Sequence, residues 1–301
     1  CATDVSSPML LGLDPIMCDC NLEDLSCDLD KLEDIFKKQS PSTLILVSPL
    51  GLVPNMLKIT QLCDEYEVIL LEDVCESMGS KYQGNYLGSM GFASFFSMYF
   101  GHHLSKIDSG FINTNDEEFY HMLLMMRSHG WDRDLPKWKQ KELRKKHSCT
   151  DFDALYNFYV PGFNLRATDL QAFIGLRAID KLDKYTSKRN INFKNYLSLI
   201  KNNKLQLLND DSNFISSFAI PIVHKERDNI VKDLITDEEE REETKQALKN
   251  QFENVPVRPY NTFANQIPAA VVDLTTRDLT GMQKPEVREK ASEFLKKKYK
   301  E

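Results

Sequence analysis

Side chains suited to proton transfer follow two short apolar runs of the sequence. His102 and His103 come shortly after the run 95–100, and Asp73 follows the run 68–71. Short apolar runs of this kind predict buried strands, and α/β folds place their chemistry beyond the carboxyl ends of such strands. We therefore predict that a carboxylate and an imidazole meet at one edge of a sheet.

The segments around these residues alternate between strand and helix patterns. Strands are expected at 15–20, 43–47, 68–71, 95–100 and 110–113, and amphipathic helices at 28–38, 55–67 and 116–126. This alternation predicts an α/β fold with a mainly parallel sheet flanked by helices.

The second half of the chain shows other patterns. The basic stretch 135–150 is interpreted as a solvated loop, with a phosphate-facing loop as the alternative. A helical pattern at 168–199 is long enough to connect two domains. We expect a large α/β domain at 1–185, and a linking helix with a smaller C-terminal α+β domain at 186–301. The elements expected in that second domain are a strand at 214–223, a helix at 237–252, a strand at 255–258 and a Lys-rich tail at 286–301.

Composition and charge narrow the classes of function. The 301 residues are 42% hydrophobic, enough for a sizeable core, and the net charge of −7 argues against nucleic acid as a partner. No run of 18 apolar residues and no signal-peptide pattern occur, so no membrane partner is expected. The seven cysteines form no C-x-x-C pair, which argues against a metal site and favours reduced thiols in the cytoplasm. Because the sequence starts at Cys1 without Met, we expect a fragment that lacks the N-terminal segment of its fold.

Four blocks of sequence, taken together, resemble one protein family. They are EDVCES at 72–77, SMYFGHHLSKIDSG at 97–110, RSHGWDRD at 127–134 and GFNLRATDLQA at 162–172. In this order and spacing they are similar to the DegT/DnrJ/StrS family of nucleotide-sugar aminotransferases, which depend on pyridoxal 5'-phosphate. The resemblance implies the aspartate-aminotransferase-like fold (fold type I of the pyridoxal-phosphate enzymes) and a homodimer as the functional unit.

The resemblance also implies roles for individual residues. Asp73 matches the carboxylate that keeps the pyridine nitrogen of the cofactor protonated. Glu76 matches a position that usually holds Gln near the ring oxygen of the cofactor. Ser97 matches a hydroxyl that binds the cofactor phosphate, and Asn164 matches a residue that reaches the phosphate bound by the neighbouring subunit.

One position departs from most of the family in a way that changes the expected chemistry. Most members have Lys where this chain has His102, and that Lys binds the cofactor covalently. One branch, the GDP-4-keto-6-deoxy-mannose 3-dehydratases, also has His there. The resemblance then implies that His102 is the catalytic base, that pyridoxal and pyridoxamine 5'-phosphate both serve as cofactor forms, and that glutamate restores the amine. The expected reaction removes the C3 hydroxyl of a 4-keto-6-deoxy nucleotide sugar.

Further residues are weaker candidates for contact with the substrate. These residues are His103, His129, Arg133 and Arg258. A displaced covalent lysine at Lys106 is the less favoured interpretation, because Lys106 lies in a loop that the family fills with small residues.

Two parts of the family pattern are missing, and alternatives therefore stay open. The Gly-Ser pair that holds the cofactor phosphate at a helix N-terminus is absent, and 269–301 shows no resemblance. The first alternative is a nucleotide-sugar aminotransferase of the same family. The second is a non-catalytic remnant, or an interaction partner of a complete homologue.

Overall fold

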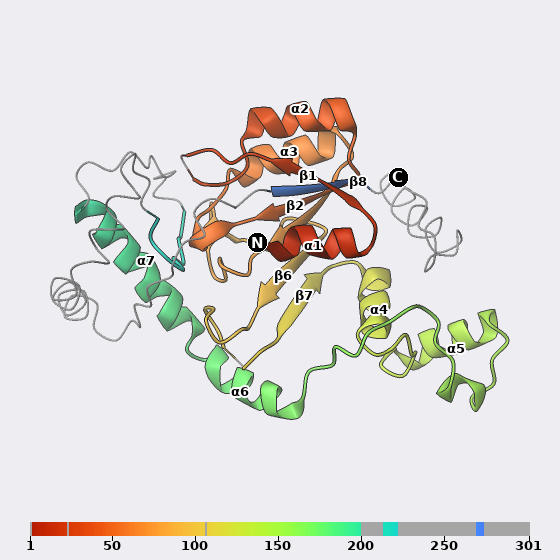
Figure 1. Ribbon diagram of the computed structural model, residues 1–301. Coiled ribbons are helices and arrows are strands. Elements are labelled where there is room, and N and C mark those ends of the chain that lie inside the picture. Colours follow the sequence, from red (N-terminus) through yellow and green to blue (C-terminus); the bar gives the residue numbers. More distant parts are fainter. Residues whose placement is uncertain (1, 23, 106, 200–212, 222–268, 274–301) are drawn as a thin grey trace, which may run out of the picture.

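A six-stranded sheet organises the computed structural model, which describes residues 2–22, 24–105, 107–199, 213–221 and, for the backbone, 269–273 (Figure 1). The spatial order of the strands is β1-β8-β2-β3-β6-β7. Their bounds are Asp14–Cys18 for β1, Thr43–Val47 for β2, Ile69–Asp73 for β3, Ala93–Ser97 for β6, Gly110–Thr114 for β7 and Ala269–Asp273 for β8. The pairings β2–β3 and β3–β6 are parallel, and β1 runs with them because it is antiparallel to β8, which is antiparallel to β2. Four strands thus share one direction, as the alternating sequence pattern predicted.

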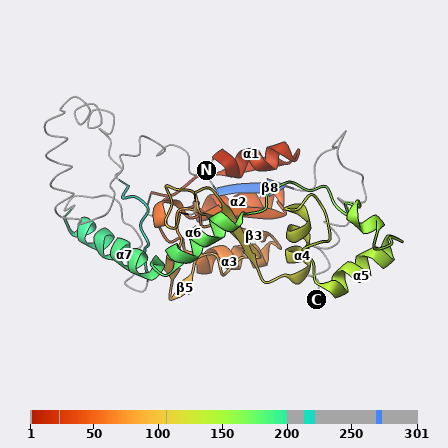
Figure 2. The same ribbon diagram turned by 90° about the horizontal axis from the view of Figure 1, so that it is seen from below.

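Helices cover both faces of this sheet. They are α1 (Ala2–Leu10), α2 (Leu29–Gln39), α3 (Met56–Glu65) and α4 (Glu117–Met126). Figure 2 shows α1 on one face and α2 and α3 on the other. The predicted helix starts are confirmed by side-chain caps, since Asp28, Asn55 and Asp116 each accept a hydrogen bond from a backbone N–H of the first turn.

The main hydrophobic core lies between the sheet and the pair α2 and α3. Leu44 and Leu46 of β2 are fully buried there, together with Phe36 of α2 and Met56 of α3. All five residues of β2 are buried, because this strand is covered on both faces. The strand ends that carry the candidate site are therefore attached to the largest buried apolar cluster of the described residues.

A buried carboxylate fixes the loop that leads into β6. Glu72 is 1% exposed and accepts hydrogen bonds from the backbone N–H groups of Gly88, Met90 and Gly91 at 2.6–2.8 Å. This loop follows the small hairpin of β4 (Lys81–Tyr82) and β5 (Asn85–Tyr86). Burial raises the pKa of Glu72 and these three N–H groups oppose that rise.

After α4 the chain forms a helical arm, which we define as residues 127–180. It contains α5 (Lys137–Lys146), the short 3-10 helix η2 (Asp153–Leu155) and α6 (Asp169–Ile179), and it leads into α7 (Leu182–Leu199). Figure 1 shows α5 and α7 at opposite ends of the molecule. No helix among the described residues is long and apolar enough to cross a membrane.

Three predicted elements differ from the structure. The solvated loop expected at 135–150 is the helix α5, because Lys, Gln, Glu, Leu and Arg favour helices even without an apolar stripe. The helix expected at 168–199 is two helices that break after Ile179, and α6 starts with a capping box of Thr168 and Gln171. The strand expected at 214–223 is an irregular segment over 213–221, with one bridge between Phe214 and Lys81.

The smaller C-terminal domain predicted at 186–301 lies largely outside the described residues. The elements expected at 237–252, 255–258 and 286–301 all fall there. Within that range, β8 joins the large sheet between β1 and β2. The domain boundary itself stays a prediction.

Candidate active site

The ends of three parallel strands meet at one edge of the sheet. Val47 of β2 is paired in register with Asp73 of β3, and Asp73 is paired with Phe95 of β6. Ser97 ends β6 two residues further along. Since parallel strands bring their carboxyl ends to the same edge, Asp73 and Ser97 lie at the position where α/β folds bind ligands.

One residue joins the predicted carboxylate to the predicted base. Asp73 is 6% exposed, and its Oδ1 accepts a hydrogen bond from the backbone N–H of Cys75 at 2.9 Å. The carbonyl oxygen of Cys75 in turn lies 2.6 Å from Nδ1 of His102. The structure thus places Asp73 and His102 in one hydrogen-bonded chain, through the turn that follows β3.

The contact with Cys75 determines which nitrogen of His102 is available for chemistry. A carbonyl oxygen only accepts, so Nδ1 of His102 donates and Nε2 carries the lone pair of the neutral ring. The ring is half-buried and packs against Phe218, with ring centres 5.2 Å apart, and edge-on against Tyr99 at 6.0 Å. His102 is therefore oriented as a proton acceptor at Nε2.

A second acid lies beside Asp73. Asp4 of α1 has its pKa raised to about 6, first by burial and then by the negative charge of Asp73. Close to neutral pH this pair holds a proton more readily than two isolated carboxylates do. Helix α1 packs here through Val5, which, like Leu71, packs against Ile45 of the sheet.

His103 has surroundings unlike those of His102. It is 6% exposed, and its Nε2 donates to the carbonyl oxygen of Ser216 at 2.7 Å. Burial, followed by the positive charge of Arg189, lowers the pKa of His103 to about 3, so the ring is neutral at physiological pH. The structure gives His103 a role in holding residues 213–218 against the site, and its contact with substrate stays a prediction.

Glu76 and Ser97 are also positioned by local hydrogen bonds. Glu76 Oε2 accepts from the backbone N–H of Leu50 at 2.9 Å, and Leu50 has a left-handed backbone with φ 56°. The carboxylate thus stabilises the strained turn after β2. The Ser97 hydroxyl accepts from the N–H of Tyr99 at 3.2 Å, which leaves its own proton free for another acceptor. The contacts of Glu76 and Ser97 with a cofactor stay predictions.

The remaining candidates lie in the arm or outside the described residues. His129 packs edge-on against Trp131 with ring centres 5.0 Å apart, and the guanidinium carbon of Arg133 lies 3.7 Å from the centre of the same indole. Asn164 is exposed and forms a backbone bridge with Ser128. Lys106 and Arg258 fall outside the described residues.

Two glycines bring the separate candidate segments of the arm together. A Cβ on Gly130 would lie 1.9 Å from the carbonyl oxygen of Val160, and Gly130 has φ 95°. A Cβ on Gly162 would lie 2.3 Å from the backbone nitrogen of Gly130. Only glycine permits this close approach, which sets His129 beside the block that contains Asn164.

Two residues of the site were not found from the sequence. Cys75 acts through its backbone N–H and carbonyl, and neither group gives a signal in the sequence. Asp4 carries no such signal, because its proximity to Asp73 depends on how α1 packs on the sheet. Among the described residues, no cluster of His, Cys, Asp and Glu has the arrangement of a metal site.

Known proteins resemble this chain over most of its described length. The sequence profile of the DegT/DnrJ/EryC1/StrS aminotransferase family matches residues 3–279. The chain is 30% identical over 229 residues to the GDP-4-keto-6-deoxy-D-mannose 3-dehydratase of Yersinia pseudotuberculosis. This alignment covers 74% of this chain and 58% of that protein. The protein of the same name from Escherichia coli O55:H7 is 31% identical over 221 residues, or 73% of this chain and 56% of that protein.

Solved structures show the same relationship. The Escherichia coli GDP-4-keto-6-deoxy-D-mannose-3-dehydratase with bound hydrated PLP has a TM-score of 0.64 at 29% identity, over 73% of this chain and 57% of that chain. The aspartate-aminotransferase-like fold is thereby confirmed. The family match extends to residue 279, so the expectation of no resemblance was wrong for 269–279. The chain spans a little over half the length of these relatives.

Proposed function

Because this chain belongs to the DegT/DnrJ/EryC1/StrS aminotransferase family, we propose that its complete form is a pyridoxal-phosphate-dependent nucleotide-sugar 3-dehydratase. The substrate is a 4-keto-6-deoxy hexose joined to a nucleotide, and glutamate is the amine donor. The observation that carries the proposal is His102, which stands where most of the family has a covalent lysine and whose Nε2 is oriented as a proton acceptor. Similarity to the two 3-dehydratases supports it.

The side chains at the carboxyl edge of the sheet are of the types that can hold this cofactor. Asp73 offers a buried carboxylate of the kind that pairs with a protonated pyridine nitrogen, and Ser97 offers a hydroxyl proton to a phosphate at the same sheet edge. Glu76, which accepts a hydrogen bond from the backbone N–H of Leu50, is the third residue that we assign to the cofactor. When bound as the amine form, the cofactor supplies the nitrogen that condenses with the ketone and a ring that accepts electron density.

The residues of this chain then have distinct tasks. Asp73 holds the positive charge of the ring, and its bond to the N–H of Cys75 keeps the carboxylate fixed. His102 accepts a proton at Nε2 and returns it to the leaving hydroxyl, while the Cys75 carbonyl holds Nδ1 protonated throughout. Without a lysine at this position, cofactor binding depends on Asp73, Ser97 and contacts of the phosphate.

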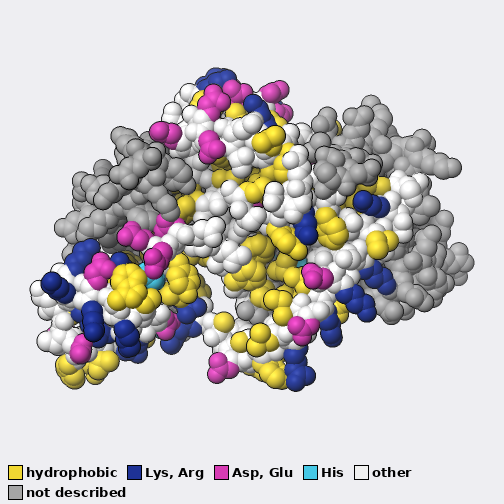
Figure 3. Space-filling model, turned by 180° about the vertical axis from the view of Figure 1, so that it is seen from behind, with side chains coloured by type: hydrophobic (Ala, Val, Ile, Leu, Met, Phe, Trp, Pro, Cys, Tyr) yellow, Lys and Arg dark blue, Asp and Glu magenta, His cyan; other side chains and the backbone are white. Residues whose placement is uncertain are grey.

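A second copy of the chain is the partner that the surface supports best. Helix α6 has no buried residue, and Leu170, Phe173, Leu176 and Ile179 are each more than half exposed. Figure 3 shows apolar side chains along the lower edge of the face seen from behind, where α6 lies. An exposed apolar helix face of this kind is typical of a surface that another protein covers. In such a homodimer, Asn164 would lie close to the partner subunit. The six described cysteines are free thiols, which supports a cytoplasmic location.

Absorbance titration of the purified protein with pyridoxal phosphate and with pyridoxamine phosphate tests the cofactor assignment. We expect both to bind reversibly to the parent protein. His102→Lys should bind pyridoxal phosphate covalently with a yellow absorbance band, and should keep it through denaturation once the linkage has been reduced with borohydride. His102→Asn should bind both forms nearly as the parent does, and should slow dehydration by the complete protein roughly 10²–10⁴-fold. An amino sugar as the product, or an Asn variant as fast as the parent, would contradict the proposal and favour the aminotransferase.

A further inference from the structure

Two cysteines lie opposite one another in the segment that leads from β1 to α2. Cys20 lies two residues beyond the end of β1, and Cys27 directly precedes Asp28, the N-cap of α2. The structure pairs Cys20 with Cys27 in an antiparallel bridge, and both thiols are free. In the described part of the chain, no other strand pairing sets one cysteine opposite another.

The backbone hydrogen bonds beside this bridge show which kind of pair the cysteines form. The N–H of Asn21 donates to the carbonyl of Ser26 at 2.9 Å, and the N–H of Asp28 donates to the carbonyl of Asp19 at 2.8 Å. Because these bonds flank the cysteines on both sides, the cysteines are a non-hydrogen-bonded pair, in which Cα atoms are about 4.5 Å apart and both side chains leave on one face. A disulfide spans roughly 4.4–6.8 Å between Cα atoms, so the bridge has the spacing that a disulfide needs.

The two thiols differ in their access to solvent. Cys20 is exposed, whereas Cys27 is 2% exposed and belongs to the main hydrophobic core. Burial raises the pKa of the Cys27 thiol, which therefore stays protonated at neutral pH. Since the thiolate is the reactive form, a reagent in solution meets Cys20 first, and Cys27 reacts with what is already bound to Cys20.

We propose that Cys20 and Cys27 form a reversible disulfide in exchange with a low-molecular-weight disulfide such as glutathione disulfide. The Cys20 thiolate attacks one sulfur of glutathione disulfide, whose S–S bond breaks, and one glutathione leaves and takes up the proton that Cys20 lost. Cys27 then loses its proton, attacks the Cys20 sulfur of the mixed disulfide and releases the second glutathione. Two cysteine thiols are thereby oxidised, and one glutathione disulfide is reduced to two thiols.

The bond joins the end of β1 to the start of α2 and closes the turn between them. Leu25 in this turn has a left-handed backbone with φ 57° and packs on the cluster of Leu52 and Phe193. Because the cysteines already lie opposite one another, the bond constrains the unfolded chain and leaves the native turn in place. The oxidised protein therefore unfolds at a higher temperature than the reduced protein.

Thiol mapping on the folded protein tests this modification. The protein is incubated with glutathione disulfide, and its remaining thiols are blocked with N-ethylmaleimide before digestion. A protease that cleaves after acidic residues separates the three cysteines of this region into the peptides 15–19, 20–23 and 25–28. We expect mass spectrometry to find 20–23 linked to 25–28, and dithiothreitol to restore both thiols. Formation of the link should accelerate as pH rises, because closure needs the thiolate of the buried Cys27.

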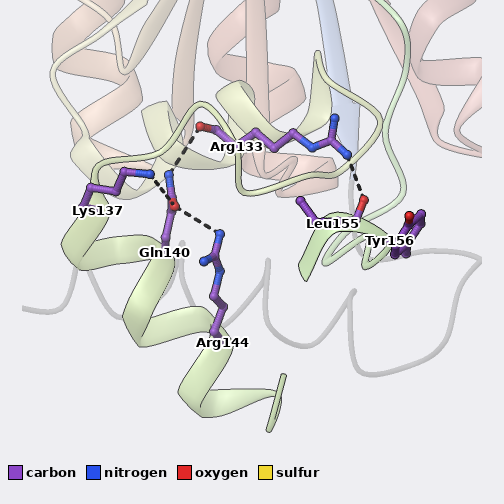
Figure 4. Close-up of a pocket in the computed structure, with 6 residues that line it drawn as sticks. All are labelled: Arg133, Lys137, Gln140, Arg144, Leu155 and Tyr156. Carbon is purple, nitrogen blue, oxygen red and sulfur yellow. Dashed lines mark hydrogen bonds between the residues drawn. The ribbon is translucent and has the colours of Figure 1, made fainter. Parts of the chain in front are cut away.

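Matched replacements locate the bond. Cys20→Ser changes an exposed position, so it should keep the fold, as circular dichroism checks, and abolish the linked peptide. Cys149→Ser is the control and should leave the link unchanged. Cys149 follows α5 in the arm, the helix in which Figure 4 shows Arg144 hydrogen-bonded to Gln140. After the same treatment, the parent should unfold a few degrees above Cys20→Ser.

Four results would overturn the proposal. The first is a link from 20–23 to 15–19, which would make Cys18 the partner of Cys20. The second is a mixed disulfide with glutathione that persists on Cys20, and the third is a bond between two copies of the chain. The fourth is a lower unfolding temperature of the treated parent than of treated Cys20→Ser, which would show that the bond does not fit the native turn.

Discussion

The sheet and the arm achieve order in opposite ways. In the sheet, residues of β2, α2 and α3 bury one another completely, and buried carboxylates such as Glu72 bind surrounding backbone N–H groups. The main apolar contact of the arm is a small cluster in which Leu135 packs with Leu124 and Met125 of α4, and α6 buries none of its residues. The arm is instead held by ion pairs, stacked rings and two close glycine contacts. A segment organised in this way depends on surfaces beyond its own core.

This difference separates two kinds of candidate site residue. Asp73 and His102 are fixed by backbone groups at the end of a buried strand, so their geometry belongs to the fold itself. Arg133 and His129 both pack against one half-buried indole, Trp131. We therefore expect changes in the sheet to remove stability and function together, and changes in the arm to affect binding and assembly first.

The largest effect on stability is expected in the core of the sheet. Leu46→Ala removes a side chain with no exposed surface, and the cavity should lower the free energy of unfolding by roughly 3–5 kcal/mol. Leu57→Ala on α3 is the control, because Leu57 is 54% exposed and its loss should cost below about 0.5 kcal/mol. Urea denaturation followed by circular dichroism measures both. Equal effects would show that the sheet is not the dominant core.

The second-largest effect on stability is expected within the arm, where Gly130 lies against Val160. Gly130→Ala combines a left-handed φ of 95° with a contact of 1.9 Å to Val160, so we expect a cost of at least about 2 kcal/mol. Gly84→Ala is the control, since Gly84 has φ 87° but no atom within 4 Å of a new Cβ. Both tryptophans lie in the arm, so tryptophan fluorescence reports its unfolding separately from circular dichroism. Coincident transitions in Gly130→Ala would mean that sheet and arm unfold as one unit.

Sequence patterns predicted the sheet well because its physical causes are local. Strands such as 43–47 are short apolar runs between turn signals. The N-cap residues Asp28, Asn55 and Asp116 mark the starts of three helices. The arm was predicted less well for the opposite reason. Helix α5 has no apolar stripe, and its order comes from contacts such as Arg144 with Asp132, which no periodicity reveals.

The candidate site likewise contains residues that sequence patterns predicted and contacts that they could not predict. Asp73 and His102 were predicted as candidates because strand ends and a family resemblance both indicated them. Their connection through Cys75 could not be predicted, because a backbone carbonyl carries no sequence signal. The acid beside Asp73 was also missed, since Asp4 is distant in sequence and reaches the site only when α1 packs on the sheet.

A smaller effect on stability is expected from Asp4, and this effect depends on pH. In the folded protein the pKa of Asp4 is raised from 3.8 to about 6, first by burial and then by Asp73. The folded state therefore binds more protons than the unfolded state across this window, and stability falls as pH rises from about 4 to about 6. Asp4→Asn should flatten this dependence and stabilise the protein at pH 7 by about 1–2 kcal/mol. Thermal denaturation at a series of pH values measures it, and an unchanged slope would argue against the Asp4 and Asp73 pair.

The smallest effect on folding, and the sharpest contrast with Leu46→Ala, is expected on α6. Leu176 is 71% exposed, so Leu176→Ala should change the free energy of unfolding of the single chain by less than about 0.5 kcal/mol. If a second copy covers this face, the same change combined with Phe173→Ala should weaken self-association by roughly tenfold or more, which sedimentation equilibrium detects. Leu57→Ala, with a similar exposed leucine on α3, should leave association unchanged. A large loss of single-chain stability in Leu176→Ala would instead show that the arm buries its apolar face within its own chain, and the contrast between sheet and arm would fail.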